Sequence, residues 1–185
     1  MKFKKSIFLK NFIKSPKYTG SIKSSSSFLA KKMVKRADLG NAKTIIELGP
    51  GTGVITKVII DQMGKDSALW TFDINKEFVD YLNGKYPKAN HIHSDILKMK
   101  EEMTKNNVKN ADAVISGIPF SFYSKKECEE MLDSISDVMH KNSILVLFSY
   151  SKLRFKTFLS KFNKVNVDFV LLNIPPAYVL TLSKK

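Results

Sequence analysis

The stretch TIIELGPGTG, residues 44–53, combines two signals that together indicate one fold. Its first half, residues 44–48, is a short apolar run rich in β-branched residues, which is typical of a strand buried in a parallel sheet. Three glycines then follow at alternate positions, 49, 51 and 53. Glycine permits a tight turn and lets a ligand lie against bare backbone, and the helix that follows offers free N–H groups to a carboxylate. The stretch therefore predicts a strand, a ligand-binding loop and a helix.

The rest of the chain repeats this alternation of strand and helix. Strand-like runs occupy residues 44–48, 68–72, 111–116 and 143–149, and helical patterns occupy 54–63, 76–85 and 124–140, the last with a capping box of Ser124 and Glu127. Two final strand-like runs, 165–172 and 177–182, predict a closing antiparallel pair. The alternation predicts an α/β fold with a doubly wound, Rossmann-like sheet that is mostly parallel. We place this domain at residues 43–185, after a basic helical segment at residues 1–42.

The positive charge of the chain is concentrated near its beginning. The sequence holds 31 Lys and Arg against 17 Asp and Glu, a formal net charge of +14, and residues 1–43 hold 12 of the basic residues and one acid. We expect this segment to bind an anionic surface. Residues 2–14 predict a short helix whose apolar arc enters a lipid headgroup layer. A second helix, from Ser26 or Ser27, carries a stripe that is either a solvated face or an anion-binding surface, made by Lys31, Lys32, Lys35 and Arg36.

Several protein classes are excluded by the sequence. The single Cys128 excludes an intramolecular disulfide and suits a reducing compartment. The longest apolar run, residues 144–148, is far shorter than the roughly 18 residues of a membrane span. His91 and His93 have no third ligand near them, so we predict no metal site. We expect a cytoplasmic monomer that associates peripherally with the inner face of the cell membrane.

Acidic residues follow the predicted strands at the edge where the glycine loop lies. Glu47 precedes the first glycine by two residues, where it would repel a phosphate and suits a ligand with a positive amino group. The spacing of the glycines also differs from the G-x-G-x-x-G of dinucleotide-binding loops. Asp73 ends the second strand, where a carboxylate can accept hydrogen bonds from ribose hydroxyls. Asp95 ends a short third strand, where an adenine amino group would be held.

A set of motifs in this chain occurs together in a known family. The motifs are the glycine loop, Asp73-Ile74-Asn75, Asp95, Ser116-Gly117-Ile118-Pro119, Pro16-x-x-Thr19-Gly20-Ser21 with Ser25-Ser26, and Asn173-Ile174-Pro175-Pro176-Ala177. This array resembles class I S-adenosylmethionine-dependent methyltransferases, and within them the bacterial soluble-type phospholipid (phosphatidylethanolamine) N-methyltransferases, relatives of the ribosomal RNA adenine dimethyltransferases. The resemblance implies S-adenosylmethionine as the cofactor. By the same resemblance, the residues that bind the cofactor are Thr19, Glu47, Gly49, Pro50, Gly51, Thr52, Gly53, Asp73, Ile74, Asp95, Ile96 and Ser116.

The same resemblance implies a lipid amine as the methyl acceptor. The implied catalytic residues are Tyr18, Ser116, Pro119 and Phe120. The Ser116 carbonyl and the Tyr18 hydroxyl would orient the amine, and aromatic rings such as Phe120, Tyr123 and Tyr178 would face the growing positive charge. A loop before the second helix would hold the lipid phosphate. The implied substrate-binding residues are Lys23, Ser25, Ser26 and Tyr178.

We therefore expect an enzyme that methylates the headgroup amine of phosphatidylethanolamine, and of its mono- and dimethyl forms, at an anionic membrane surface, with no stable nucleic-acid partner. The Ser116-Gly117 pair favours this interpretation, because the RNA enzymes usually place an Asn there to grip a planar base amine. Two alternatives stay open. One is a ribosomal RNA adenine N-methyltransferase, which the basic N-terminus favours, and the other is a non-catalytic membrane-binding module that retains a cofactor pocket.

Overall fold

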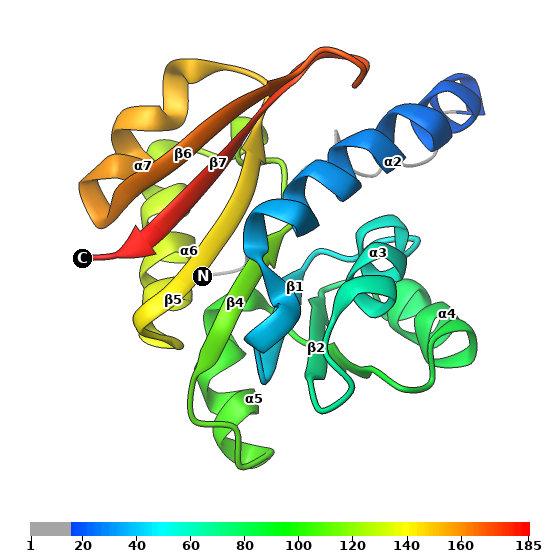
Figure 1. The fold of residues 1–185 in the computed structure, drawn as a ribbon, viewed down its shortest axis with the longest axis vertical. Coiled ribbons are helices and arrows are strands. Elements are labelled where there is room, and N and C mark those ends of the chain that lie inside the picture. The colour runs from blue at the N-terminus through cyan, green and yellow to red at the C-terminus, as the bar shows by residue number, and fades with distance from the viewer. Residues whose placement is uncertain (1–15) are drawn as a thin grey trace.

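A seven-stranded sheet in the order β3-β2-β1-β4-β5-β7-β6 forms the centre of the molecule (Figure 1). In this computed structural model, the backbone is described for residues 16–185 and the side chains for residues 27–185. The strands are β1 (Thr44–Leu48), β2 (Ala68–Asp73), β3 (Asn90–His93), β4 (Ala111–Ser116), β5 (Met139–Ser149), β6 (Phe162–Val170) and β7 (Ala177–Lys184). The helices are α2 (Pro16–Ala37), α3 (Val54–Gln62), α4 (Lys76–Lys85), α5 (Met99–Lys105), α6 (Lys125–Asp137) and α7 (Phe155–Lys161).

The first five strands are parallel, and the strand order reverses at β1, which pairs with β2 on one side and β4 on the other. Strand β7 is antiparallel to both β5 and β6, so the predicted closing pair is confirmed. Ser149 at the end of β5 lies opposite Tyr178 near the start of β7. The turn between β6 and β7 therefore lies at the same edge of the sheet as the carboxyl ends of the parallel strands.

Two layers of helices bury the two faces of the sheet. Helices α2 and α3 pack on one face around Met33, Ile59 and Ile115. Helices α5, α6 and α7 pack on the other face around Met103, Leu132 and Phe158. The central strands β1 and β4 are buried from both sides, which explains why their sequences read as continuous apolar runs.

The first described helix is longer than the sequence indicated. We expected a loop at residues 23–26 and a helix that starts at Ser26 or Ser27, but α2 runs unbroken from Pro16 to Ala37. No glycine or proline follows Gly20 in this stretch, so nothing interrupts the backbone hydrogen bonds of the helix. The predicted helix at residues 2–14 lies outside the described residues.

The cationic stripe of α2 is partly used for packing. The Arg36 guanidinium donates to both carboxylate oxygens of Asp168 on β6, with Nη2 2.7 Å from Oδ1, and Lys32 Nζ lies 3.6 Å from Oδ1. On the opposite side of α2, Met33 and Val34 are fully buried in the core. Residues 29–37 therefore join the core of the sheet domain, while Lys31 and Lys35 stay exposed.

The boundary between α6 and β5 also differs from its prediction. Ser124 and Glu127 form the predicted capping box, but α6 ends at Asp137, before the predicted end at His140. Met139 pairs with Ala111 of β4, and Ala111 N donates to Val138 O at 2.8 Å. Pairing with the neighbouring strand extends β5 back to Met139 because these long-range hydrogen bonds replace those of another helical turn.

Candidate functional site

The glycine loop joins β1 to α3 at the point where the strand order reverses. All three of its glycines have positive φ values, +65° at Gly49, +54° at Gly51 and +82° at Gly53. Residues with a side chain rarely adopt such values. A Cβ atom at Gly51 would meet no atom of the described residues within 4 Å, so this part of the loop presents open backbone to them. In α/β sheets, ligands bind at the carboxyl edge at such a switch point. The loop therefore has the geometry that a bound ligand requires.

The loop is held tightly by the turn that follows β4. Gly117 N donates to Leu48 O at 2.8 Å, and a Cβ atom at Gly117 would lie only 2.8 Å from Gly49 O. On the other side, Gly49 N donates to Phe72 O at 2.9 Å. The loop conformation thus depends on both neighbouring strands, and Gly117 permits a close approach that no larger residue allows.

Asp73 lies at the end of β2 beside the loop. Its Oδ2 accepts a hydrogen bond from Gly51 N at 3.2 Å, and its Oδ1 accepts one from Asn75 N at 2.8 Å. Burial raises the pKa of Asp73, although these two backbone hydrogen bonds oppose the rise. The carboxylate is therefore directed at the centre of the glycine loop, as a ligand-binding residue at this position would be.

Glu47 is a fully buried carboxyl group on β1, directly before the loop. Its Oε2 accepts a hydrogen bond from Thr56 Oγ1 at 2.7 Å, whereas Oε1 has no hydrogen-bond partner among the described residues. Burial raises the pKa of Glu47 to about 8, partly opposed by hydrogen bonds from Thr56, and the charge of Asp73 raises it further. A cation bound beside the loop would favour the charged form of Glu47 and offset its burial, so the two carboxyl groups suit a cationic ligand.

The end of β3 contributes a short turn with one exposed apolar side chain. Asp95 caps this 3-10 turn (Ile96–Lys98) by accepting a hydrogen bond from Leu97 N at 3.0 Å. The turn directs Ile96 into the core and leaves Leu97 exposed. Ile74, which follows β2, is exposed as well. Of the apolar side chains near Asp73 and Asp95, Ile74 and Leu97 are thus open to a ligand. The sequence prediction named Ile96, whose side chain is buried, and did not name Leu97, because only the turn geometry shows which of the two side chains is exposed.

The turn after β4 places its aromatic residues differently from the prediction. Phe120, expected to face the substrate, is fully buried, and its ring packs edge-on against Phe158 of α7 at a centroid distance of 5.4 Å. The 3-10 turn Phe120–Phe122 directs this ring into the core. Tyr123 is half-buried instead, and burial, followed by the negative charges of Glu127, Asp95 and Asp73, raises the pKa of its phenol. The tyrosine thus lies in the electric field of the same acidic site.

The remaining predicted residues have separate surroundings. Ser116 is fully buried and its Oγ accepts a hydrogen bond from Ile118 N at 3.3 Å, while Pro119 stays partly exposed. Tyr178 packs against Phe155 and Phe169, with ring centroids 5.6 Å and 4.7 Å away. The side chains of Tyr18, Thr19, Lys23, Ser25 and Ser26 lie outside the described side chains.

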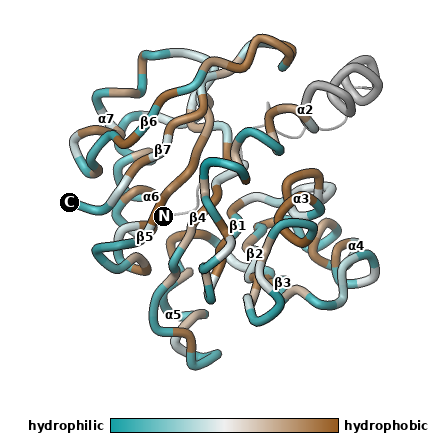
Figure 2. Tube along the Cα trace, viewed as in Figure 1, coloured by the Kyte–Doolittle hydropathy of each residue, from teal (hydrophilic) through white to brown (hydrophobic). Residues whose placement is uncertain are grey.

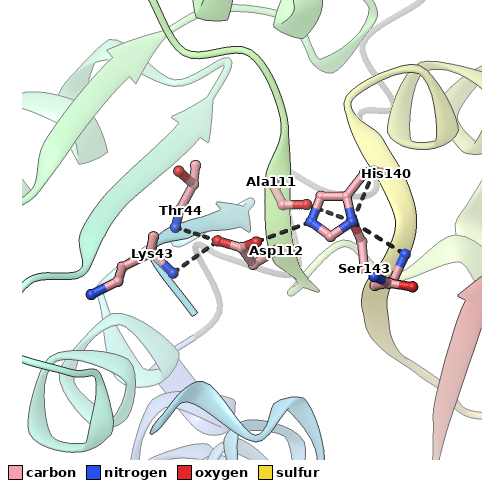
Figure 3. Close-up of polar contacts among 7 residues, drawn as sticks. Lys43, Thr44, Ala111, Asp112, His140 and Ser143 are labelled. Carbon is pink, nitrogen blue, oxygen red and sulfur yellow. Dashed lines mark hydrogen bonds and ion pairs between the residues drawn. The ribbon is translucent and has the colours of Figure 1, made fainter. Parts of the chain in front are cut away.

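The histidines and a second polar cluster have structural surroundings. His91 contacts Thr71 Oγ1 and Tyr86 O, and His93 contacts Ile74 O. Within residues 27–185, no group of three or more His, Cys, Asp or Glu could hold a metal ion. Figure 3 shows Asp112, which accepts hydrogen bonds from Lys43 N and Thr44 N and contacts His140 Nε2 at 2.9 Å. This cluster lies where β1 and β4 begin, so it joins strands at the edge opposite the glycine loop.

Known proteins resemble this chain in both sequence and fold. A family profile described as "Methyltransferase domain" matches residues 45–142. The ornithine lipid N-methyltransferase of Singulisphaera acidiphila is 26% identical over 175 residues, which cover 92% of this chain and 91% of that protein. The ribosomal RNA small subunit methyltransferase A of Malacoplasma penetrans is 29% identical over 120 residues, which cover 62% of this chain and 42% of that protein.

Solved structures resemble the whole sheet domain. The magnesium protoporphyrin IX methyltransferase of Synechocystis PCC 6803 with bound SAH has a TM-score of 0.71 at 11% identity, covering 90% of this chain and 86% of that one. The same enzyme with bound SAM has a TM-score of 0.68 at 13% identity, covering 95% and 85%. At these identities the likeness concerns the fold, and it matches the observed Rossmann-like sheet with antiparallel strands at its end.

Proposed function

We propose that this chain, which belongs to the methyltransferase domain family, uses S-adenosylmethionine to methylate the headgroup amine of a membrane lipid. The observation that carries the proposal is the glycine loop between two carboxyl groups, Glu47 and Asp73, at the switch point of the sheet. The two solved structures of one protein of the same fold, with bound SAM and with bound SAH, support the choice of cofactor.

The residues of the loop region fit S-adenosylmethionine. When bound, this cofactor supplies an activated methyl group on a positively charged sulfonium. The Oε1 of Glu47, which has no hydrogen-bond partner among the described residues, lies in an acidic site that suits the ammonium or sulfonium charge, and the open backbone at Gly51 leaves room for the ligand. Asp73 would hold the ribose, and the exposed Ile74 and Leu97 would cover the adenine ring. Gly49, Pro50, Thr52, Gly53, Asp95 and the end of β4 would complete the cofactor site.

The acceptor amine must be neutral and held in line with the methyl group. Its nitrogen lone pair would form the new C–N bond to the methyl group, S-adenosylhomocysteine would leave, and the resulting ammonium would lose a proton to solvent. The Ser116 carbonyl, the Tyr18 hydroxyl and Pro119 would orient the amine. The Tyr123 ring would face the positive charge as it develops, because aromatic faces attract methylated ammonium groups. Positioning of this kind supplies much of the acceleration, up to roughly 7–11 kcal/mol in favourable cases.

Similarity over most of the chain favours a lipid over an RNA acceptor. The lipid-modifying relative is matched over 91% of its length, whereas the RNA-modifying relative is matched over 42% of its length. Phosphatidylethanolamine and ornithine lipid both present a primary amine, and we place phosphatidylethanolamine first. No helix within residues 16–185 is long and apolar enough to cross a bilayer. We propose that the enzyme reaches its lipid from the membrane surface.

The test is transfer of a labelled methyl group to defined acceptors. Purified protein is incubated with methyl-labelled S-adenosylmethionine and vesicles that contain phosphatidylethanolamine, vesicles that contain ornithine lipid, or ribosomal RNA. We expect label in the lipid and none in the RNA, and mass spectrometry of the product counts the methyl groups. Label in RNA alone would refute the lipid proposal in favour of an RNA methyltransferase. Cofactor binding without transfer to any acceptor would indicate a non-catalytic membrane-binding module.

A further inference from the structure

Exposed apolar side chains are concentrated around the turn between β6 and β7. Of the twelve exposed large apolar side chains among the described residues, seven lie between residues 153 and 174. We call three of these the hairpin tip. They are Leu171, Leu172 and Ile174, which are 69%, 64% and 67% exposed. Figure 2 shows apolar residues at this turn, which lies at the top of Figure 1.

The hairpin tip projects beyond the sheet. Val170 and Ala177 form the last pair of the β6–β7 ladder, so residues 171–176 extend past it. Asn173 is turned inward and buried, and its Nδ2 donates to Pro175 O at 2.6 Å. The polar residue of the turn thus faces the protein while its apolar neighbours face outward. This is the reverse of the usual arrangement in a solvent-exposed loop, and contiguous exposed apolar side chains mark interaction sites.

The location of the tip relates it to the candidate site. The turn lies at the carboxyl edge of the sheet, where the glycine loop also lies. At the same edge, the 3-10 turn Lys152–Arg154 follows β5 and carries Leu153, which is 79% exposed. A surface that binds the hairpin tip would therefore face the edge at which the acceptor must enter.

The charge around the tip identifies the chemistry of its partner. Residues 138–185 contain eight basic residues and one acid, Asp168, and that acid is paired with Arg36. Residues 44–137 contain more acids than bases, 15 against 11, so the net positive charge of the sheet domain lies in residues 138–185. Lys152 and Arg154 lie in the turn after β5, at the same edge of the sheet as the tip, whereas Lys164 and Lys184 lie on β6 and β7 toward the opposite edge. Lys152 Nζ lies 5.4 Å from the centroid of Tyr178, in the wall of a shallow hollow of about 330 Å³ that Lys164 and Phe169 also line.

A protruding apolar turn with Lys152 and Arg154 at the same edge of the sheet matches an anionic bilayer. Aliphatic side chains can enter the boundary between headgroups and acyl chains, while cations remain beside the lipid phosphates. Lysines contribute about 1 kcal/mol each near such a surface. We propose that the hairpin tip inserts into an anionic lipid bilayer and holds the glycine-loop edge of the sheet against the membrane. The inference rests on the proposed function, because a lipid acceptor requires that the site face a bilayer.

The test is sedimentation of the full chain with vesicles of phosphatidylcholine and phosphatidylglycerol. The variant Leu171→Ser/Leu172→Ser/Ile174→Ser removes the aliphatic side chains from the tip. We expect its vesicle partition coefficient to fall by at least about tenfold, since three large side chains no longer enter the bilayer. The matched control is Val165→Ser, which removes an apolar side chain that is 55% exposed from the middle of β6, and its partitioning should equal that of the wild type.

A second variant measures insertion directly. Leu172→Trp places a fluorophore in the tip, and we expect its emission to shift to shorter wavelength with vesicles and to be quenched by brominated acyl chains. Thermal unfolding of each variant is the check that these exposed substitutions leave the fold intact. Equal vesicle binding by the triple variant and the wild type would overturn the proposal, as would vesicle binding lost only on deletion of residues 2–14. A wild-type dimer that the triple substitution converts to a monomer would assign the tip to self-association and also overturn it.

One further arm separates this inference from the proposed function. A short-chain phosphatidylethanolamine, used as a dissolved monomer, needs no membrane contact. The triple variant should methylate this lipid at the wild-type rate and lose methylation of the same headgroup in vesicles. If the wild type methylates no lipid at all, the proposed function fails, while the sedimentation and fluorescence results still decide the role of the tip.

Discussion

The substitution Glu47→Gln isolates the effect of the buried carboxyl group beneath the glycine loop. Glu47 is fully buried, and its Oε2 accepts a hydrogen bond from the Thr56 side chain. The carbonyl oxygen of a glutamine can accept the same hydrogen bond. The variant has nearly the same shape but cannot ionise. Any pH dependence that disappears in it therefore belongs to this carboxyl group.

The magnitude follows from the difference in proton affinity between the folded and unfolded states. A glutamate in the unfolded chain titrates near 4.5, and burial raises the pKa of Glu47 to about 8 in the folded protein. The folded state therefore binds more protons than the unfolded state between these values, so its stability falls as the pH rises through this window. Each unit of difference in pKa corresponds to about 1.36 kcal/mol. The loss in the free energy of unfolding therefore approaches about 4 kcal/mol by pH 8 and is absent below pH 4.

The assay is thermal unfolding of the ligand-free protein across pH 4 to 9. For a chain of this length, about 4 kcal/mol corresponds to a fall in Tm of about 10 °C. We expect the wild type to show this fall and Glu47→Gln to lack it, so that the variant is the more stable protein at pH 8. Glu101→Gln changes an exposed glutamate and is the matched control. Parallel pH profiles for the wild type and Glu47→Gln would refute the reasoning.

Three further predictions concern the loop and the opposite edge of the sheet. Asp73→Asn should weaken S-adenosylmethionine binding by about tenfold to a hundredfold in calorimetry, because a charged hydrogen bond contributes about 1.5–3 kcal/mol, and an unchanged Kd would remove Asp73 from the site. Gly117→Ala should lower Tm by several degrees, since its Cβ would lie 2.8 Å from Gly49 O, and a wild-type Tm would show that the turn can shift. Asp112 is partly buried, which raises its pKa, but hydrogen bonds from Thr44 N, His140 and Lys43 N outweigh this and hold the pKa below its ordinary value. Its stabilisation is therefore present at neutral pH and lost in acid, so Asp112→Asn should lower Tm at pH 7 and match the wild type at strongly acidic pH.

Local patterns in the sequence predicted most of the sheet correctly. The strands at 44–48 and 111–116 and the helix at 76–85 have their predicted bounds. These elements are recognisable because buried parallel strands are apolar throughout and a surface helix repeats every 3.6 residues. Helices α5 and α7 have seven residues each, too few for such a repeat to be evident, and were not predicted.

The candidate site was predicted less completely than the fold. The glycine loop, Glu47 and Asp73 follow from their places at the ends of strands, and the structure brings all three together. Which neighbours are open to a ligand depended on two 3-10 turns, which bury Ile96 and Phe120 and leave Leu97 exposed. Whether a side chain in such a turn faces inward is decided by what packs against it, for example Phe158 against Phe120. That partner is 38 residues away, and no local pattern reports it.

By itself, the sequence determined the fold class, the position of the glycine loop and the acidic character of the site, because these depend on residues that are close together in the chain. The tertiary structure alone decided how the charge and the apolar surface are used. Folding pairs Arg36 with Asp168, 132 residues later in the chain. It also leaves Leu171, Leu172 and Ile174 exposed at the edge of the sheet where the glycine loop lies. Burial and ion pairing join residues from distant elements, so only the folded chain shows which cations are already neutralised and which apolar side chains remain outside the core.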